Sequence, residues 1–205
     1  ARDHDHLHLI VDQDPTVPNR QAAINGGPDD VSPRLTAMAK RLEAAGADFL
    51  VMVCNTAHVF TDDMLDAIGI PFYSIIDESV AEVDRLSPDA KAVGIMATDG
   101  CIATGIYQRA IEASGRRALV PEADSLAELM ALITAIKSGS QGTDIAERMQ
   151  KVASDLVERG ADALILGCTE SPIVFDGSGA AVPAITATGG LARRTTEIAA
   201  GQAAQ

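Results

Sequence analysis

Aromatic side chains are almost missing from this sequence: they make up 3% of its 205 residues, and tryptophan is absent. Apolar residues still make up 47% of the chain, so a core can form. That core must be built mainly from Ala, Val, Ile and Leu side chains. A chain of this length corresponds to one domain or to two small ones.

Basic residues are also in short supply. The chain has 16 Lys and Arg residues against 29 Asp and Glu residues, which gives a formal net charge of −13. This balance argues against nucleic acids and anionic membrane surfaces as partners. A few convergent cations could still bind a small anionic molecule. No apolar run approaches the roughly 18 residues of a membrane-spanning helix, so we expect no membrane partner.

Cysteine is rare as well, with three residues in the whole chain and no C-x-x-C pair. An odd and small number is not a disulfide framework, and we therefore expect a reducing, cytoplasmic setting. His4, His6 and His8 alternate and could lie on one face as metal ligands. No Cys or carboxylate stands at a recognisable ligand spacing from them, so we expect no metal site.

Apolar runs of strand length alternate with helical patterns, such as the stripe of Leu35, Met38, Ala39 and Leu42. Several runs are apolar throughout, which is typical of parallel strands covered on both faces. The sequence therefore predicts an α/β fold with parallel sheets. The expected strands are Leu7–Val11, Phe49–Val53, Phe72–Ile75, Ala92–Ala97, Ala118–Val120, Ala163–Leu166 and Val182–Ile185.

One segment occurs twice. Residues 42–56 and 156–170 share a Leu, a Gly-Ala-Asp triplet, a second Leu and a Cys at one constant offset, which places Cys54 opposite Cys168. A repeat of this size indicates two similar halves related by a pseudo-two-fold axis. Such an axis would put the two cysteines face to face, with the active site in the cleft between the halves.

The Ser87-Pro88-Asp89 stretch is the best boundary between the halves. We assign residues 1–88 to a first α/β half and residues 89–188 to a second. The C-terminal helix, residues 189–205, is expected to join the first half.

Both cysteines follow an expected strand and precede polar residues that could open a helix. Ligands gather at the carboxyl ends of parallel strands, where helix N-termini also favour a thiolate. Asn55, Thr56 and Thr169 add hydrogen-bond donors beside the thiols, suited to a substrate carboxylate. A single cysteine here could be a small buried apolar residue. Two cysteines at equivalent positions of the repeat favour another interpretation, in which a substrate carbon lies between the two thiols and exchanges a proton with them.

His58 offers another interpretation, because a His four residues after a Cys suggests a Cys–His nucleophile. The second cysteine is followed by Glu170 and Ser171 and has no matching His. The two-thiol interpretation is therefore preferred.

Five ordered motifs resemble those of the aspartate/glutamate racemase family and cover nearly the whole chain. They are Asp14-Pro15-x-x-Pro18-Asn19-Arg20, Val53-Cys54-Asn55-Thr56-Ala57-His58, Gly94-Ile95-Met96-Ala97-Thr98-Asp99-Gly100 with Gly105-Ile106-Tyr107-Gln108, Ile136-Lys137-Ser138-Gly139 and Gly167-Cys168-Thr169-Glu170. The resemblance implies racemisation of an acidic amino acid, aspartate, glutamate or similar, without pyridoxal phosphate or any other cofactor. It also implies a homodimer. Cys54 and Cys168 would be catalytic, and the implied substrate-binding residues are Arg20, Asn55, Thr56, Thr98, Lys137, Thr169 and Glu170.

The sequence departs from the family at two points. Family members begin with a βα unit of roughly 30 residues that carries a Gly-rich loop, and this sequence starts after it. We therefore expect such a unit before Ala1, and a first-half sheet with fewer strands than the second. Asn19 also stands where the family usually has Asp. Cys101 takes a position where the family often has Thr and is expected to be a bystander.

Two other functions stay open. A relative of the same family could isomerise a dicarboxylate such as maleate, with one cysteine attacking as a nucleophile. A non-catalytic relative would bind its ligand without exchanging an α-proton.

Overall fold

The computed structural model describes residues 6–201. Its helices are α1 (Arg20–Ile24), α2 (Ser32–Ala44), α3 (Asp62–Asp66), α4 (Ile75–Leu86), α5 (Asp99–Thr104), α6 (Ile106–Ala113), α7 (Ala123–Lys137), α8 (Thr143–Glu158) and α9 (Ala187–Ala199), with 3-10 turns η2 (Thr56–Phe60) and η3 (Ser171–Ile173). Its strands are β1 (Leu50–Val51), β2 (Phe72–Tyr73), β3 (Ala92–Ala97), β4 (Arg117–Leu119), β5 (Ala163–Gly167) and β6 (Ala184–Thr186). Within this part of the chain, no helix is long and apolar enough to cross a membrane.

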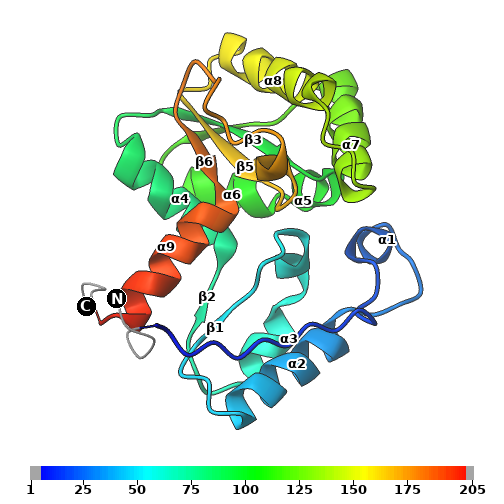
Figure 1. The fold of residues 1–205 in the computed structure, drawn as a ribbon, viewed down its shortest axis with the longest axis vertical. Helices are drawn as coiled ribbons and strands as arrows, with labels where there is room; N and C mark the ends of the chain where they lie inside the picture. Colours follow the sequence, from blue (N-terminus) through cyan, green and yellow to red (C-terminus); the bar gives the residue numbers. More distant parts are fainter. Residues whose placement is uncertain (1–5, 202–205) are drawn as a thin grey trace.

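The strands form two sheets, and every pairing is parallel. A four-stranded sheet has the order β4-β3-β5-β6, and a two-stranded sheet pairs β1 with β2. The larger sheet occupies the upper body in Figure 1 and the smaller one the lower body. The α/β fold class with parallel sheets is confirmed.

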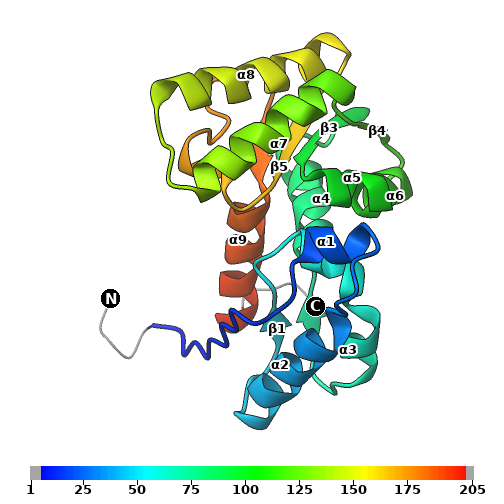
Figure 2. The same cartoon turned by 90° about the vertical axis from the view of Figure 1, so that its right-hand side faces the viewer.

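The four-stranded sheet is covered on both faces. Buried side chains of α4, α6 and α9 pack on one face, and those of α7 and α8 pack on the other. Figure 2 shows α7 and α8 together on the outer side of this sheet. Every residue of β3 and β5 is buried, which explains why both strands are apolar throughout.

Helix α4 lies before residue 88 in the sequence, but its apolar face packs into the core under the four-stranded sheet. Helix α9 packs beside α4, and its Arg194 reaches towards the smaller sheet, with the guanidinium 5.6 Å from the Tyr73 ring centre. Arg193 Nε also donates to Glu82 Oε2 of α4 at 2.7 Å. The division at residue 88 and the place of the C-terminal helix stay predictions.

The first half has a smaller core of its own. Leu35 and Ala39 of α2 pack against Leu50 of β1 and Met64 of α3. The buried positions of α2 belong to the apolar stripe seen in the sequence, spaced to bring one helix face onto the sheet. Within residues 6–201, this half contributes two strands and the second half four.

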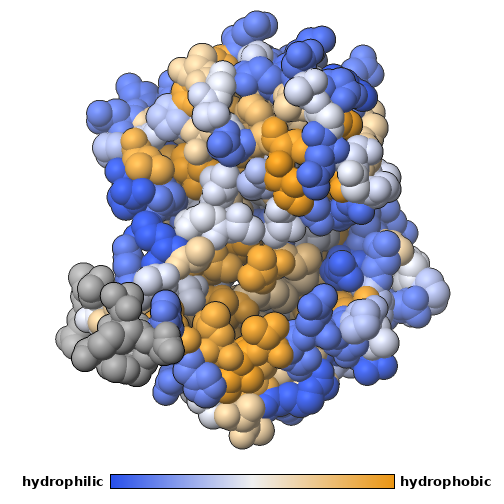
Figure 3. Space-filling model, in the orientation of Figure 1, coloured by the Kyte–Doolittle hydropathy of each residue, from blue (hydrophilic) through white to orange (hydrophobic). Residues whose placement is uncertain are grey.

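The expected strand at Leu7–Val11 is wrong. This segment has no regular secondary structure and no strand partner among the described residues, and Leu9 and Val11 are 69% and 79% exposed. Alternating apolar residues favour a strand, yet a strand also needs a neighbour to pair with. Figure 3, in the orientation of Figure 1, shows apolar residues gathered at the centre of the lower body, where Figure 1 draws β1 and the segment that leads to α1.

The duplicated segment has the same local structure in both halves. β1 leads to Cys54 and then to η2, and β5 leads to Cys168 and then to η3. Strand, cysteine and short turn therefore recur in one order. This recurrence is consistent with two similar halves, while the pseudo-two-fold axis itself stays a prediction.

Gly167 provides a test of the packing beneath the second cysteine. A Cβ at this position would lie 2.8 Å from Tyr107 Cε2 and 3.0 Å from Ala97 Cβ. We expect Gly167→Ala to lower the free energy of unfolding by about 1–3 kcal/mol, as overpacking of a rigid core does. Denaturant titration would measure this loss.

Gly69→Ala is the matched control, because the nearest atom to its added Cβ is Glu43 Oε1 at 3.3 Å, at the end of a flexible side chain. We expect the free energy of unfolding of this variant to stay within about 0.5 kcal/mol of the parent value. Equal effects of the two substitutions would contradict the packing described for Gly167.

Candidate active site between the two cysteines

Tyr107 of α6 connects the segments that carry the two cysteines. Its hydroxyl donates to Asn55 Oδ1 at 2.5 Å, and Asn55 directly follows Cys54. Its ring lies on Gly167, which directly precedes Cys168. One buried side chain therefore contacts the neighbour of each thiol, and the fold brings the two cysteine segments together.

Burial raises the pKa of Tyr107 far above its usual range. The phenol therefore stays a neutral hydrogen-bond donor. The Ser79 hydroxyl oxygen of α4 lies 3.5 Å from the phenol oxygen, and this hydroxyl donates to Ile75 O at 2.6 Å. These contacts give the tyrosine a fixed orientation in the core.

The half-buried Cys54 lies between the end of β1 and the start of η2. His58 holds this turn, because its Nδ1 lies 2.8 Å from the Cys54 carbonyl oxygen and its Nε2 accepts the Ile75 N–H at 3.2 Å. The second contact requires an unprotonated Nε2, so Nδ1 carries the hydrogen and donates to Cys54. His58 therefore ties the Cys54 turn to the start of α4 and is not placed as a base for the thiol.

Burial lowers the pKa of His58 from 6.5 to about 4, against the opposing effect of its hydrogen bond to Cys54. The imidazole is consequently neutral at physiological pH. A neutral ring suits a group that donates through one nitrogen and accepts through the other.

Three further contacts join the halves beside Cys54. The Thr56 and Thr98 hydroxyl oxygens are 3.1 Å apart, and Gln21 of α1 donates to Asp99 at the start of α5. The Cys101 thiol lies 3.6 Å from Thr56 Oγ1. Burial raises the pKa of Cys101, which keeps it a thiol in the wall of the site.

The surroundings of Cys168 are different. Its side chain is 4% exposed, and its Sγ donates to Glu170 Oε2 at 2.9 Å. Thr169 Oγ1 donates to the same oxygen at 3.0 Å, and Lys137 Nζ lies 3.6 Å from Glu170 Oε1. Burial, the hydrogen bond to Glu170 and the negative charge of Glu170 raise the pKa of Cys168 to about 12.

Glu170 itself is ionised. Burial raises the pKa of this carboxyl, but the hydrogen bond from Cys168, the Lys137 ammonium and the Thr169 hydroxyl outweigh burial and leave the pKa lowered. The carboxylate is therefore occupied by contacts within the protein.

Two buried polar atoms beside the cysteines have no hydrogen-bond partner within residues 6–201. They are Asn55 Nδ2 and Ser171 Oγ, and their residues are 4% and 0% exposed. A buried donor without a partner costs roughly 1–3 kcal/mol and calls for an explanation. Asn55 directly follows Cys54, and Ser171 lies three residues after Cys168.

Arg20 stands apart from this cluster. Its Nη1 donates to Pro18 O at 3.0 Å and Val17 O at 3.3 Å, within its own loop. Asn19 caps α1 by accepting from the Gln21 and Ala22 backbone N–H groups, a role that its side-chain oxygen fills as an Asp would. The structure thus joins Asn55, Thr56, Thr98, Lys137, Thr169 and Glu170 in contacts around the cysteines and leaves Arg20 outside them.

Sequence reasoning missed Tyr107 and Ser171. Tyr107 is one of two tyrosines in an aromatic-poor chain, and its place within the Gly105-Ile106-Tyr107-Gln108 motif is the signal that could have singled it out. Ser171 follows the second motif directly, but its buried, unpartnered hydroxyl is visible only in the structure.

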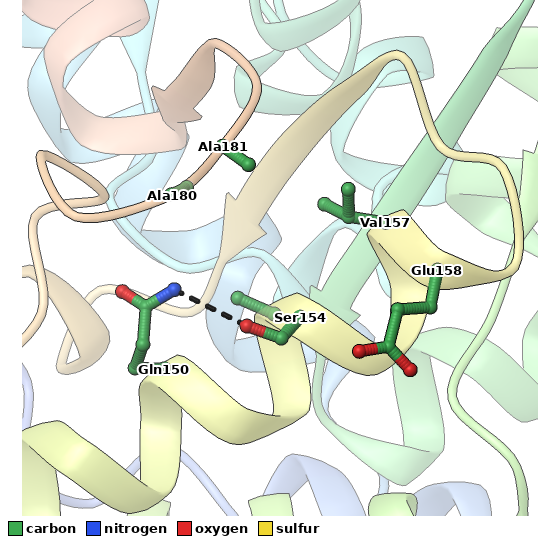
Figure 4. Close-up of a pocket in the computed structure, with 7 residues that line it drawn as sticks. Gln150, Ser154, Val157, Glu158, Ala180 and Ala181 are labelled. Atoms are coloured by element: carbon green, nitrogen blue, oxygen red, sulfur yellow. Dashed lines mark hydrogen bonds between the residues drawn. The ribbon is translucent and has the colours of Figure 1, made fainter.

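The remaining candidates are weaker. The described part of the chain holds no group of three or more His, Cys, Asp or Glu residues that could bind a metal, and His4 lies outside it. Figure 4 shows a pocket between α8 and the loop at Ala180 and Ala181, in which Gln150 Nε2 donates to Ser154 Oγ at 3.4 Å. Neither cysteine lines it, and it lacks paired titratable groups.

Comparison with known proteins identifies the family. The family model described as Asp/Glu/Hydantoin racemase matches residues 1–194. The chain belongs to this family. Its named members are racemases, which are isomerases.

Individual relatives agree with this assignment. The broad specificity amino-acid racemase RacX of Bacillus subtilis (strain 168) is 27% identical over 95% of this chain and 83% of its own length. A glutamate racemase of Desulforudis audaxviator is 32% identical over 64% of this chain, but the match spans 47% of that protein. The structure of Picrophilus torridus aspartate racemase has a TM-score of 0.83 at 24% identity, covering 97% and 82% of the two chains, and shows the shared fold.

The His58 contacts predict a pH-dependent stability. Because the folded-state pKa of about 4 lies below the usual 6.5, protonation favours the unfolded chain. The contribution of the neutral imidazole to the free energy of unfolding is present in full above about pH 6.5. It is lost as the pH falls towards 4, and the loss is on the order of 3 kcal/mol. Denaturant titrations across this range should show a steeper loss in the parent than in His58→Gln.

His8→Gln is the control, because His8 is exposed. Its stability should follow the pH dependence of the parent protein. If His58→Gln and the parent lose stability in parallel between pH 6.5 and 4, the imidazole is not held neutral in the fold.

Proposed function

We propose that this protein racemises an amino acid by proton transfer between Cys54 and Cys168, without pyridoxal phosphate. The observation that carries the proposal is the position of Tyr107, which contacts the neighbour of each cysteine. Two thiols on either side of one substrate are what proton removal from one face and delivery to the other require.

The polar groups beside the thiols support this chemistry. An amino-acid carboxylate offers acceptor oxygens for Asn55 Nδ2 and Ser171 Oγ, which have no partner in the described chain. The α-proton of an amino acid is very weakly acidic, so a racemase must stabilise the carbanion that develops. Fixed dipoles in a site that excludes water are well suited to this task. Thr56, Thr98 and Thr169 add hydroxyls to the same surroundings.

The proposed reaction moves one proton in and one proton out. A thiolate takes the α-proton as the C–H bond breaks, and the electron pair remains on the substrate as a carbanion. The opposite thiol then gives its proton to the other face and is left as a thiolate. The net charge of the site is unchanged over the reaction.

An acidic side chain is the substrate class that we favour. Lys137 reaches Glu170, which in turn contacts Cys168, so one cation lies two contacts from a thiol. Arg20 on α1 is the second cation that we assign, and its planar fork fits a carboxylate. To bind one, it would exchange its present contacts with the Val17 and Pro18 carbonyl oxygens for the substrate. In a chain with a net charge of −13, such a pair would select an acidic substrate.

The two cysteines should act as a unit. We expect either Cys54→Ala or Cys168→Ala to reduce racemisation by more than ~100-fold, the scale of a lost general base. Chiral chromatography of the product from each enantiomer would measure the rates. Cys101→Ser is the matched control and should be nearly silent, because this thiol is buried in the wall of the site. If either Cys54→Ala or Cys168→Ala racemises at the wild-type rate, the two-thiol mechanism is wrong.

Arg20 should matter only for acidic substrates. Arg20→Met would leave the substrate's distal carboxylate unpaired. We therefore expect kcat/KM for aspartate to fall by a factor that corresponds to a loss of transition-state stabilisation on the order of 2–5 kcal/mol. The value for alanine, measured in parallel, should hardly change. An equal loss for both substrates would mean that Arg20 does not recognise the side chain.

A further inference from the structure

The two thiols have unequal surroundings, although the segments that carry them are repeats. Cys168 donates to a carboxylate at 2.9 Å. Cys54 is held through its backbone carbonyl by His58, a neutral side chain. Glu170 therefore introduces an asymmetry that the duplicated sequence does not require.

We infer that Glu170 is a positioning residue that acts through Cys168. Its carboxylate accepts the thiol hydrogen and keeps Cys168 protonated, so that Cys168 is the proton donor of the resting protein. Lys137 weakens this effect, because its positive charge offsets the negative charge of Glu170. The inference rests on the proposed racemisation for its catalytic meaning. It concerns a role that differs from binding substrate, because the Glu170 carboxylate is already occupied.

The geometry around Glu170 supports this role. One carboxylate oxygen accepts from both Cys168 Sγ and Thr169 Oγ1, and the other faces Lys137 Nζ at 3.6 Å. An ionised carboxylate can only accept hydrogen bonds, so the shared hydrogen must belong to the thiol. A thiolate at Cys168 would place two negative charges in contact inside a buried site, which is strongly unfavourable.

This arrangement assigns the first half-reaction. With Cys168 held as the thiol, Cys54 has to accept the α-proton, and the Cys168 S–H bond breaks to protonate the opposite face. Cys54 then carries the proton, and Cys168 is a thiolate beside Glu170. The repulsion between these two negative charges favours uptake of a proton from water by Cys168, while Cys54 releases its proton to water, and the two transfers together restore the resting form. The opposite direction must begin from this less stable form.

Steady-state kinetics alone would not reveal the asymmetry. The equilibrium constant between two enantiomers is one, so kcat/KM must be equal in both directions whatever the protonation of each thiol. The reactivity of each cysteine is a better measure, because only the thiolate is alkylated. The protein can be treated with iodoacetamide at about pH 8, and peptide mass spectrometry then follows each cysteine separately.

Removing the carboxylate charge should release the thiol. In Glu170→Gln we expect Cys168 to be alkylated at least about tenfold faster than in the parent protein, since one pH unit of titration changes the thiolate fraction tenfold. Cys54 in the same sample should change less than about twofold. Glu158→Gln removes an exposed carboxylate of α8 and should leave both rates unchanged.

Removing the lysine should have the opposite sign. Lys137→Met takes away the cation that offsets the Glu170 charge, so Cys168 should be alkylated more slowly than in the parent. A general loosening of the site would speed alkylation in both variants. Opposite signs therefore support the inference, whereas acceleration in both, or no change in Glu170→Gln, would overturn it.

The outcome is independent of turnover. If the protein proves not to racemise any amino acid but the alkylation rates shift in opposite directions, the hold of Glu170 on Cys168 stands and the proposed function fails. If racemisation is observed and the alkylation rates do not shift, the proposed function stands and the role of Glu170 is wrong.

Discussion

The site depends on one side chain, the buried phenol of Tyr107. Its hydroxyl binds the residue after Cys54, and its ring covers the glycine before Cys168. Gly167 is required there because any Cβ would collide with the ring. The position of α6 under the four-stranded sheet therefore sets the approach of the two cysteine segments. The contacts of Thr56 with Thr98 and of Gln21 with Asp99 reinforce the same alignment of the halves.

The two cysteine turns are stabilised by opposite means. A neutral imidazole secures the Cys54 turn through backbone groups, and a carboxylate secures the Cys168 thiol directly. Burial disfavours the charged form of the His58 imidazole. It also opposes ionisation of Glu170, but the contacts with Cys168, Thr169 and Lys137 outweigh burial and keep this carboxylate ionised. A duplicated scaffold can in this way supply two thiols of different character.

The sequence predicted the features that depend on local pattern. The apolar runs at Ala92–Ala97 and Ala163–Leu166 became the buried central strands, and the repeat located Cys54 and Cys168 at equivalent strand ends. It failed at Leu7–Val11, because alternation does not reveal whether a pairing strand exists. It also could not show that Glu170 faces a thiol. The two residues are two positions apart, but the backbone conformation after β5, which a residue pattern does not reveal, decides whether the carboxylate turns back to Cys168 Sγ.

Exchange of the substrate α-proton tests the central claim most directly. Each enantiomer of aspartate, glutamate and alanine would be incubated with the protein in deuterated water, and the α-proton signal followed by nuclear magnetic resonance. Proton transfer between two thiols predicts that the signal disappears while the opposite enantiomer, carrying deuterium, accumulates until the two are equal. Binding without loss of the α-proton, or a lasting covalent adduct on Cys54 or Cys168, would contradict it.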